Sequence, residues 1–264
     1  MNKRLKDLFN LSGRVAVVTG GAGFLGEAIC EGLAEAGANV VIVSLHPLKC
    51  KKLADRLTRD YGVKTWAGLM DISKEVSVKK CFVQIAKKMS RVDILVNNAY
   101  FGSSGDLAKM SEDDWQKGID GTINGVWRCT KGVLPYFTAG GVIINIASMY
   151  GLVSPDPRIY ADDMSIVNPP NYGAGKAAIL QFTRYAAVHL APHHIRVNSI
   201  SPGAFPGAQD SGNRDFMAKL KDKIPLERPG QPDELKGPVV FLASDASSYM
   251  TGANIAVDGG WTAW

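Results

Sequence analysis

The sequence predicts a doubly wound α/β domain with a mostly parallel sheet of seven strands. Short apolar runs alternate with segments whose apolar residues recur at helical spacing. Several runs, such as NVVIVS at 39–44, are apolar on both faces, as in a parallel strand that helices cover on both sides. The same rhythm extends over all 264 residues. We therefore expect a single domain spanning 1–264 rather than two smaller ones.

The strands are expected where short apolar runs end at turn-forming residues. They cover 14–19, 39–44, 63–70, 92–97, 141–148, 194–201 and 254–260. Helices are expected after the glycine-rich segment up to Gly37, after Pro47, over 74–89, and from an N-cap at Ser111. A further helix is expected to run from an N-cap at Asn171 to about 190, because the two preceding prolines disfavour an earlier start.

Composition limits the classes of function. Hydrophobic residues are 46% and charged residues 21% of the chain, which is typical of a folded protein with a substantial core. The net charge of +5 comes without a block of like charges, so we expect no nucleic-acid partner. No apolar run approaches the ~18 residues of a membrane span. We find no secretory signal, and four cysteines far apart in sequence indicate free thiols in the cytoplasm rather than a metal site.

A glycine-rich segment follows the first strand. The residues TGGAGFLG begin at Thr19 and contain G-x-G-x-x-G at Gly21, Gly23 and Gly26, ahead of a helix. Such glycines let the backbone turn tightly and approach a pyrophosphate, which the helix N-terminus stabilises. The alternative is a tight turn without a ligand. The expected cofactor contacts are Gly20, Gly21, Gly23, Phe24, Leu25 and Gly26.

The end of the second strand indicates which cofactor binds. An NAD-type site usually has an acidic residue about 20 positions after the glycines, on the ribose 2′-hydroxyl. This chain instead has Ser44 and His46 there, followed by Lys49, Lys51 and Lys52. Without a carboxylate to repel a 2′-phosphate, NADP(H) is favoured over NAD(H). The alternative is that the lysines form the solvated face of a helix.

A serine, a tyrosine and a lysine follow the fifth strand. Ser148 ends that strand, and Tyr172 and Lys176 share one face of the next helix because they are four residues apart. A phenol with a pKa near 10 is a poor acid or base at neutral pH, and a neighbouring ammonium favours its ionised form. The serine hydroxyl is placed to donate a hydrogen bond to a substrate oxygen.

Several motifs in order resemble those of the short-chain dehydrogenase/reductase family, over essentially the full length. They are TGGAGFLG, Asp71, NNA at 97–99, Asn124, Ser148, YGAGK at 172–176, PG at 202–203 and VDGG at 257–260. The resemblance implies a Rossmann-type enzyme in which Tyr172 is the general acid and base and Ser148 orients the carbonyl or alcohol. It also implies that Lys176 binds the nicotinamide ribose and lowers the tyrosine pKa, while Asn124 anchors a water. The remaining cofactor contacts that it implies are Asp71, Ile72, Asn98, Ala99, Tyr172, Lys176, Pro202 and Gly203.

The sequence departs from the family pattern in three places. Phe24 stands where a glycine is usual, Tyr100 replaces the glycine after NNA, and 23 residues separate Ser148 from Tyr172, about twice the usual number. The insertion at 149–171 is rich in hydrogen-bonding groups, which favours a sugar-like or nucleotide-linked sugar substrate. Its alternative role is a surface or subunit-contact loop. A substrate loop is expected at 203–225. The candidate substrate residues are Tyr100, Tyr150, Arg158 and Phe205.

Together these features predict an NAD(P)(H)-dependent oxidoreductase that interconverts a ketone and a secondary alcohol, with a small-molecule substrate and no metal. Two alternatives remain open. A 3-oxoacyl-[acyl-carrier-protein] reductase would use Arg128 and Lys131 to meet an acidic carrier protein, and a non-catalytic sensor would keep the fold and bind NADP without turnover. The family resemblance further implies a homo-oligomer, a dimer or a homotetramer.

Overall fold

The computed structural model describes residues 4–103, 105–160, 168–207 and 213–264. Within these residues seven strands form one sheet in the order β3-β2-β1-β4-β5-β6-β7, and every neighbouring pair is parallel. The strands are β1 (Val15–Thr19), β2 (Asn39–Ser44), β3 (Thr65–Leu69), β4 (Ile94–Asn97), β5 (Gly141–Ile146), β6 (Ile195–Pro202) and β7 (Asn254–Val257). The predicted doubly wound sheet is therefore confirmed, and it is parallel throughout.

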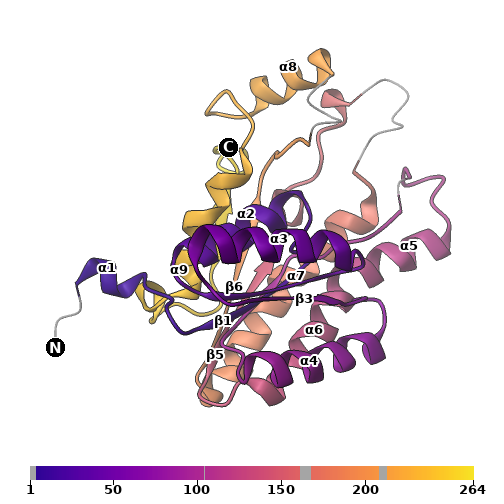
Figure 1. Ribbon diagram of the computed structural model, residues 1–264. Coiled ribbons are helices and arrows are strands. Elements are labelled where there is room, and N and C mark those ends of the chain that lie inside the picture. The colour runs from indigo at the N-terminus through magenta and orange to yellow at the C-terminus, as the bar shows by residue number, and fades with distance from the viewer. Residues whose placement is uncertain (1–3, 104, 161–167, 208–212) are drawn as a thin grey trace.

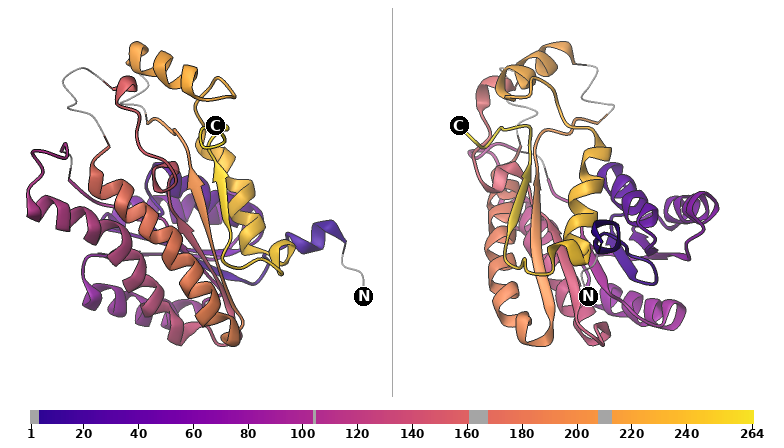
Figure 2. Two further views of the ribbon diagram at one scale, coloured as in Figure 1. Left: turned by 180° about the vertical axis from the view of Figure 1, so that it is seen from behind. Right: turned by 90° about the vertical axis from the view of Figure 1, so that its left-hand side faces the viewer.

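Helices cover both faces of the sheet (Figure 1). Figure 2 shows α7 and α9 on opposite sides of β6 and β7. The apolar contacts place α2 and α3 with α9, and α4 and α6 with α7. The helices are α1 (Leu5–Leu8), α2 (Phe24–Glu35), α3 (Pro47–Tyr61), α4 (Glu75–Met89), α5 (Glu112–Ile119), α6 (Gly125–Val133), α7 (Pro170–Leu190), α8 (Arg214–Lys223) and α9 (Lys236–Ala243).

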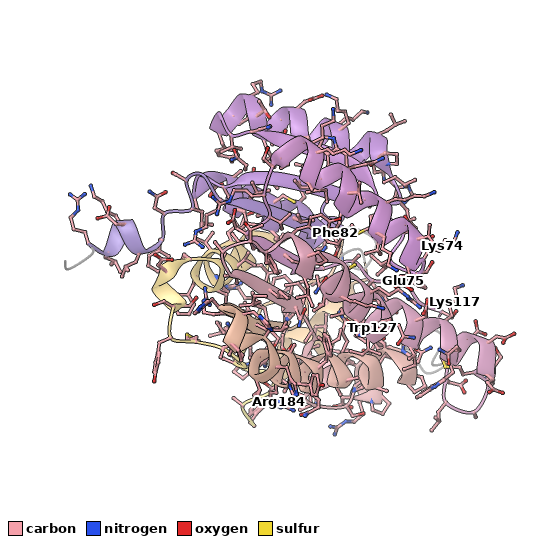
Figure 3. All side chains as sticks on the ribbon, turned by 90° about the horizontal axis from the view of Figure 1, so that it is seen from below. Lys74, Glu75, Phe82, Lys117, Trp127 and Arg184 are labelled. Atoms are coloured by element: carbon pink, nitrogen blue, oxygen red, sulfur yellow. The ribbon has the colours of Figure 1, made fainter. Side chains whose placement is uncertain are left out.

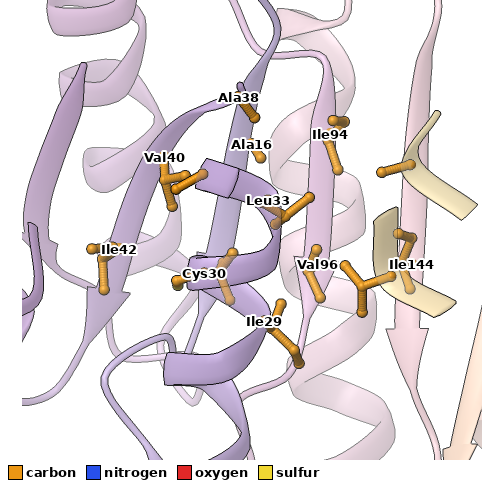
Figure 4. Packing of buried hydrophobic residues seen from close by; sticks show 14 of the residues in the cluster. Ala16, Ile29, Cys30, Leu33, Ala38, Val40, Ile42, Ile94, Val96 and Ile144 are labelled. Atoms are coloured by element: carbon orange, nitrogen blue, oxygen red, sulfur yellow. The ribbon is translucent and has the colours of Figure 1, made fainter. Parts of the chain in front are cut away.

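The core forms because side chains alternate across each strand. In β1, Ala16 and Val18 face α2, while Val15 and Val17 face α4 and α6. Figure 4 shows the first of these layers, in which Ile29, Cys30 and Leu33 of α2 pack against the sheet. Each fully buried aliphatic side chain contributes about 1.5–3 kcal/mol. The two layers hold the carboxyl ends of the strands in fixed positions, and the site lies at those ends.

One predicted helix boundary is confirmed and one needs correction. Helix α2 ends at Glu35 with Ala36 as its C-cap, and Gly37 follows with a φ of +92°, the left-handed conformation in which a glycine commonly ends a helix. Helix α7 begins at Pro170 rather than after an N-cap at Asn171. Proline is well tolerated at the first helical position, where its missing N–H needs no partner. The side chain of Asn171 is fully buried, and its Nδ2 donates to the carbonyl oxygen of Asp114 at 2.8 Å.

The helix predicted to begin at Ser111 is confirmed, but it is not continuous. The Ser111 hydroxyl accepts a hydrogen bond from the N–H of Asp114 at 3.1 Å. A π-helical segment, Asp120–Asn124, then separates α5 from α6. Within it, Thr122 lies against α7 so closely that a Cβ at Gly175 would be 1.9 Å from its Oγ1. π-Helical turns occur frequently at functional sites.

No helix in the described part of the chain is long and apolar enough to cross a membrane. Among the same residues, no group of three or more His, Cys, Asp or Glu is placed to hold a metal ion.

Candidate active site

A cleft of about 430 Å³ opens at the carboxyl ends of β1, β2, β3 and β4. The sheet order reverses beside β1, and open parallel sheets bind ligands at such a point. Predicted cofactor residues that line the cleft are Gly20, Gly23, Phe24, Leu25, Gly26, Ser44, His46, Asp71, Ile72, Asn98 and Ala99. The sequence prediction did not include Leu45, Met70 and Phe101, which also line it. These three are apolar residues next to predicted positions, and no motif distinguishes them.

The glycine turn is shaped for close approach of a ligand. Gly20 has a φ of +63°, which L side chains rarely adopt. A Cβ at Gly26 would lie 2.2 Å from the carbonyl oxygen of Gly20. Helix α2 begins after Gly23 with no side-chain cap, so its first N–H groups are available to an anion. This donor set fits a pyrophosphate.

Gly21 and Asn98 support the turn from behind. Gly21 packs beneath the cleft, where a Cβ would be 2.9 Å from the Cys30 sulfur. Asn98 donates through Nδ2 to the carbonyl oxygens of Thr19 and Gly20, at 3.0 and 3.1 Å. The Thr19 hydroxyl accepts from the N–H of Asn98 at 3.0 Å. β4 thereby fixes the shape of the loop after β1.

The far end of the cleft has no acid at the end of β2. The Ser44 hydroxyl accepts from the N–H of His46 at 3.0 Å, so its side chain stabilises the turn into α3. Helix α3 has no side-chain cap and no acidic residue in its first turn. Lys49 lines the cleft, and no ion pair with Lys49 is recorded among the described residues. Both the helix N-terminus and the ammonium favour an anion here.

Ser148, Tyr172 and Lys176 come together where β5 and α7 meet. Ser148 and Tyr172 line the same cavity, and the Ser148 side chain acts on the Tyr172 phenol to lower its pKa. The Lys176 ammonium donates to the carbonyl oxygen of Ile146 at 2.7 Å and lies 5.5 Å from the centre of the Tyr172 ring. The Ser148 hydroxyl also accepts from the N–H of Tyr150 at 3.1 Å, which leaves its own proton available to a ligand.

Burial controls the ionisation of this group. Burial raises the pKa of Tyr172 above its ordinary value, and the neighbouring Ser148 hydroxyl partly offsets that rise. Burial also lowers the pKa of Lys176 to about 8. Desolvation is the largest effect on the phenol pKa, and the lowering of that pKa by the Lys176 ammonium stays a prediction. At neutral pH the phenol is protonated and able to donate.

Asn124 is not part of this group. Its Nδ2 donates to Asp120 at 3.2 Å, and Asp120 pairs with Arg128 at 2.5 Å. Arg128 in turn donates to the carbonyl oxygen of Ile72 at 3.2 Å. Thr122 and Ile123 of the π-helical segment contact α7. The side chain of Asn124, on which the family resemblance places a role, is engaged with Asp120.

A second cavity, of about 240 Å³, adjoins Ser148 and Tyr172. It is lined by Ser148, Met149, Tyr150, Tyr160, Asn168, Tyr172, Gly203, Ala204, Phe205, Pro206, Phe216 and Leu220. The predicted residues Tyr150 and Phe205 are therefore in place. Gly203 also lines it, close against Asp258, while Pro202 is the buried last residue of β6.

Two predicted substrate residues lie elsewhere. Tyr100 lines the cofactor cleft, and its ring packs edge-on against Tyr172 with 5.0 Å between the ring centres. Arg158 is a correction: its side chain is 77% exposed, lies outside the cavity and binds Asp156 at 2.7 Å. A carboxylate two residues away is a closer partner for this guanidinium than a ligand at Ser148.

The insertion and the predicted substrate loop pack on each other. Tyr150 and Tyr160 share an apolar cluster with Leu220 and Ile224, and the Tyr160 ring lies 6.1 Å from that of Phe216 in α8. Lys223 of α8 binds Asp156 at 2.8 Å. Their described parts form one wall over Ser148 and Tyr172. Residues 161–167 and 208–212 of these two predicted loops lie outside the described residues.

Comparisons with known proteins agree with this geometry. A family model described as Enoyl-(Acyl carrier protein) reductase matches residues 21–262. The chain is 37% identical to a sorbose reductase of Candida albicans, covering 97% of this chain and 89% of that protein. It is 33% identical to a 3-oxoacyl-[acyl-carrier-protein] reductase of Aquifex aeolicus, covering 95% and 98%.

A solved structure of a gluconate 5-dehydrogenase from Burkholderia cenocepacia, in complex with NADP and tartrate, is also similar. It superposes with a TM-score of 0.89 at 30% identity, covering 99% of this chain and all of that one. The fold, the cleft and these relatives lead to one conclusion: the chain belongs to the short-chain dehydrogenase/reductase family and is an NAD(P)-dependent ketone/alcohol oxidoreductase.

Proposed function

We propose that this enzyme reduces the keto group of a sugar-like substrate with NADPH, or oxidises the corresponding alcohol with NADP⁺. The observation that carries the proposal is the grouping of Ser148, Tyr172 and Lys176, with Ser148 and Tyr172 lining the second cavity and Tyr172 packed against Tyr100 of the cleft. The cofactor, when bound, supplies or accepts the hydride at its nicotinamide ring. The glycine turn and the start of α2 would hold its pyrophosphate.

The protein supplies the proton and the orientation. The Tyr172 hydroxyl donates its proton to the substrate oxygen during reduction and takes it back during oxidation. Ser148 donates a hydrogen bond to the same oxygen and fixes its direction. The Lys176 ammonium, held by Ile146, places a positive charge near the phenolate that forms.

NADP(H) is favoured over NAD(H) by the charges around the turn from β2 into α3. A 2′-phosphate there would meet Lys49 and the uncapped N-terminus of α3, and no carboxylate of that turn would repel it. The gluconate 5-dehydrogenase of similar structure is an NADP complex, which supports the same preference.

A sugar-like substrate is supported by the second cavity. Hydroxyl and amide groups of Ser148, Tyr150, Tyr160 and Asn168 line it, and such groups match a ligand with several hydroxyls. Its volume of about 240 Å³ is below the roughly 300–1,000 Å³ of common ligand pockets. A free sugar therefore fits better than a nucleotide-linked one. The relatives named for sorbose and gluconate add support.

A 3-oxoacyl-[acyl-carrier-protein] reductase is the second candidate, since one similar relative carries that name. The two cations proposed to meet the carrier are already engaged. Arg128 pairs with Asp120, and Lys131 lies 3.3 Å from Glu75 and 4.9 Å from the centre of the Trp127 ring. Figure 3 shows Trp127 and Glu75 on this side of the molecule. We therefore place this candidate second.

We also propose a cytoplasmic homo-oligomer, a dimer or a tetramer. Trp115 and Trp127 are 39% and 44% exposed, and such aromatic rings are enriched at interfaces. The four cysteines are free and buried, as suits a reducing compartment. Light scattering of the purified chain tests the assembly: a monomer would contradict it.

The function is tested by following nicotinamide absorbance with four ketones. They are L-sorbose, 5-keto-D-gluconate, ethyl acetoacetate and an acetoacetyl group on acyl carrier protein, each with NADPH and with NADH. We expect the sugars to have the higher kcat/KM, and NADPH to be preferred. Turnover of the carrier-linked substrate alone would favour the second candidate. A preference for NADH would contradict the cofactor proposal.

A further inference from the structure

We infer that Tyr150 and Tyr160 are specificity-determining residues, which bind a hydroxyl group of an uncharged polyhydroxylated ketone. This inference rests on the proposed function and narrows its substrate class. The two phenol oxygens are 2.8 Å apart, and both side chains are buried, with 7% and 5% exposure. Both line the cavity beside Ser148 and Tyr172.

Counting donors shows that this pair has a proton to offer. Each phenol carries one O–H, and only one of the two protons can lie between the oxygens. Asn168 donates to the Tyr160 oxygen at 3.2 Å, so it supplies another donor rather than an acceptor. Within the part of the chain that the structure describes, no acceptor is recorded for the second phenol proton. Buried donors are normally paired, so an oxygen of a ligand in this cavity is the fitting partner.

The position of the pair relative to the reaction is fixed by short connections. Tyr150 is two residues after Ser148, and its N–H donates to the Ser148 hydroxyl at 3.1 Å. Tyr160 is held from the other side by the Phe216 ring. The pair is therefore rigidly joined to the group that orients the reacting oxygen. When the reacting oxygen of a small substrate binds Ser148, a hydroxyl on another of its carbons would lie in the same cavity as this pair.

The charge of the cavity limits the substrate class. Its lining residues in the described chain include no Lys, Arg, Asp or Glu. The nearest cations of the wall, Arg158 and Lys223, both bind Asp156. A substrate carboxylate would enter without a cation to pair with it, which is costly in a buried site. A neutral ketose fits better than a keto acid.

The test compares Tyr160→Phe with the wild type on L-sorbose and on ethyl acetoacetate, which has no hydroxyl. The variant keeps the ring that packs on Phe216 and removes only the oxygen. We expect kcat/KM for L-sorbose to fall about tenfold, mainly through KM, and that for ethyl acetoacetate to stay within about twofold. Tyr185→Phe is the matched control, because Tyr185 is 57% exposed and does not line the cavity.

Tyr150→Phe is the second variant, and it keeps the test decisive if Tyr160→Phe does not fold. Removing either oxygen is expected to give the same selective loss. Equal losses on both ketones, or no loss on either, would overturn the inference while leaving the proposed function intact. A wild-type preference for 5-keto-D-gluconate over L-sorbose would overturn the uncharged substrate class. If the wild type reduces no ketone with NADPH, the proposed function fails and the inference fails with it.

Discussion

The cofactor cleft and the substrate cavity are linked by the packing of Tyr100 against Tyr172 but are built differently. The cleft is formed by strand ends and by backbone, with glycines at its closest contacts. The cavity is formed by side chains from an insertion and from the loop and helix after β6, segments joined to each other by Asp156 and Lys223. Changes in the cleft should therefore affect cofactor binding and folding, whereas changes in the cavity should affect the choice of substrate.

The largest effect is expected where the two regions meet. Tyr172→Phe removes the proton donor but keeps the ring that packs against Tyr100. We expect kcat/KM to fall about 10³-fold, within the range typical of general acid catalysis. NADPH binding, measured by fluorescence titration, should change little because the ring is retained. A variant with more than a tenth of wild-type activity would contradict the role of Tyr172.

The next largest effect is expected where backbone atoms of the cleft lie in close contact. Gly26→Ala places a Cβ 2.2 Å from the carbonyl oxygen of Gly20, so the turn must shift. We expect a loss of about 1–3 kcal/mol in the free energy of unfolding together with weaker NADPH binding. Gly237→Ala is the control, because it lies in α9 with nothing within 4 Å of its added Cβ. That control should be neutral or stabilising. Equal stability and equal NADPH binding of the two variants would contradict the claim that close backbone contacts form the cleft.

The pH dependence of kcat/KM tests the role of Lys176. Its ammonium is present below its pKa, which burial lowers to about 8. If the positive charge assists the reaction, kcat/KM for ketone reduction should decline as the pH rises through about 8, by up to tenfold per pH unit. A steady-state profile from pH 6 to 10 measures this decline. A profile that stays flat to pH 10 would show that the charge of Lys176 is not required.

The smallest effect concerns the outer end of the cleft. Lys49→Ala removes one exposed ammonium near the start of α3. We expect the KM for NADPH to rise about three- to tenfold, in keeping with the modest strength of exposed charge pairs, and the KM for NADH to stay unchanged. Lys52→Ala, from the same helix, is the control, since Lys52 does not line the cleft. A parallel change for both cofactors would mean that Lys49 does not recognise the 2′-phosphate.

The difference between the cofactor cleft and the substrate cavity also explains which features the sequence could predict. The glycine turn and the group of Ser148, Tyr172 and Lys176 follow from strand ends and from a four-residue helical spacing, both of which are local. The pairing of Tyr150 with Tyr160 joins two segments without periodicity, so no spacing rule indicates it.

Two side chains differ from their expected surroundings for physical reasons. Asn124 is the last residue of a π-helical segment, whose i→i+5 hydrogen bonds rotate side chains away from the directions that an α-helix gives. Arg158 turns outward because Asp156, two residues before it, offers a bidentate partner at the surface.

The most direct test of the central claim is isotope transfer from NADPH that carries deuterium on the transferring carbon of the nicotinamide. The enzyme is incubated with this cofactor and L-sorbose in ordinary water, and the product is examined by mass spectrometry and NMR. We predict one deuterium on the new carbinol carbon and a hydroxyl proton from water, with product formation about 10³-fold slower in Tyr172→Phe. Product without deuterium, or transfer that Tyr172→Phe leaves at the wild-type rate, would contradict the account.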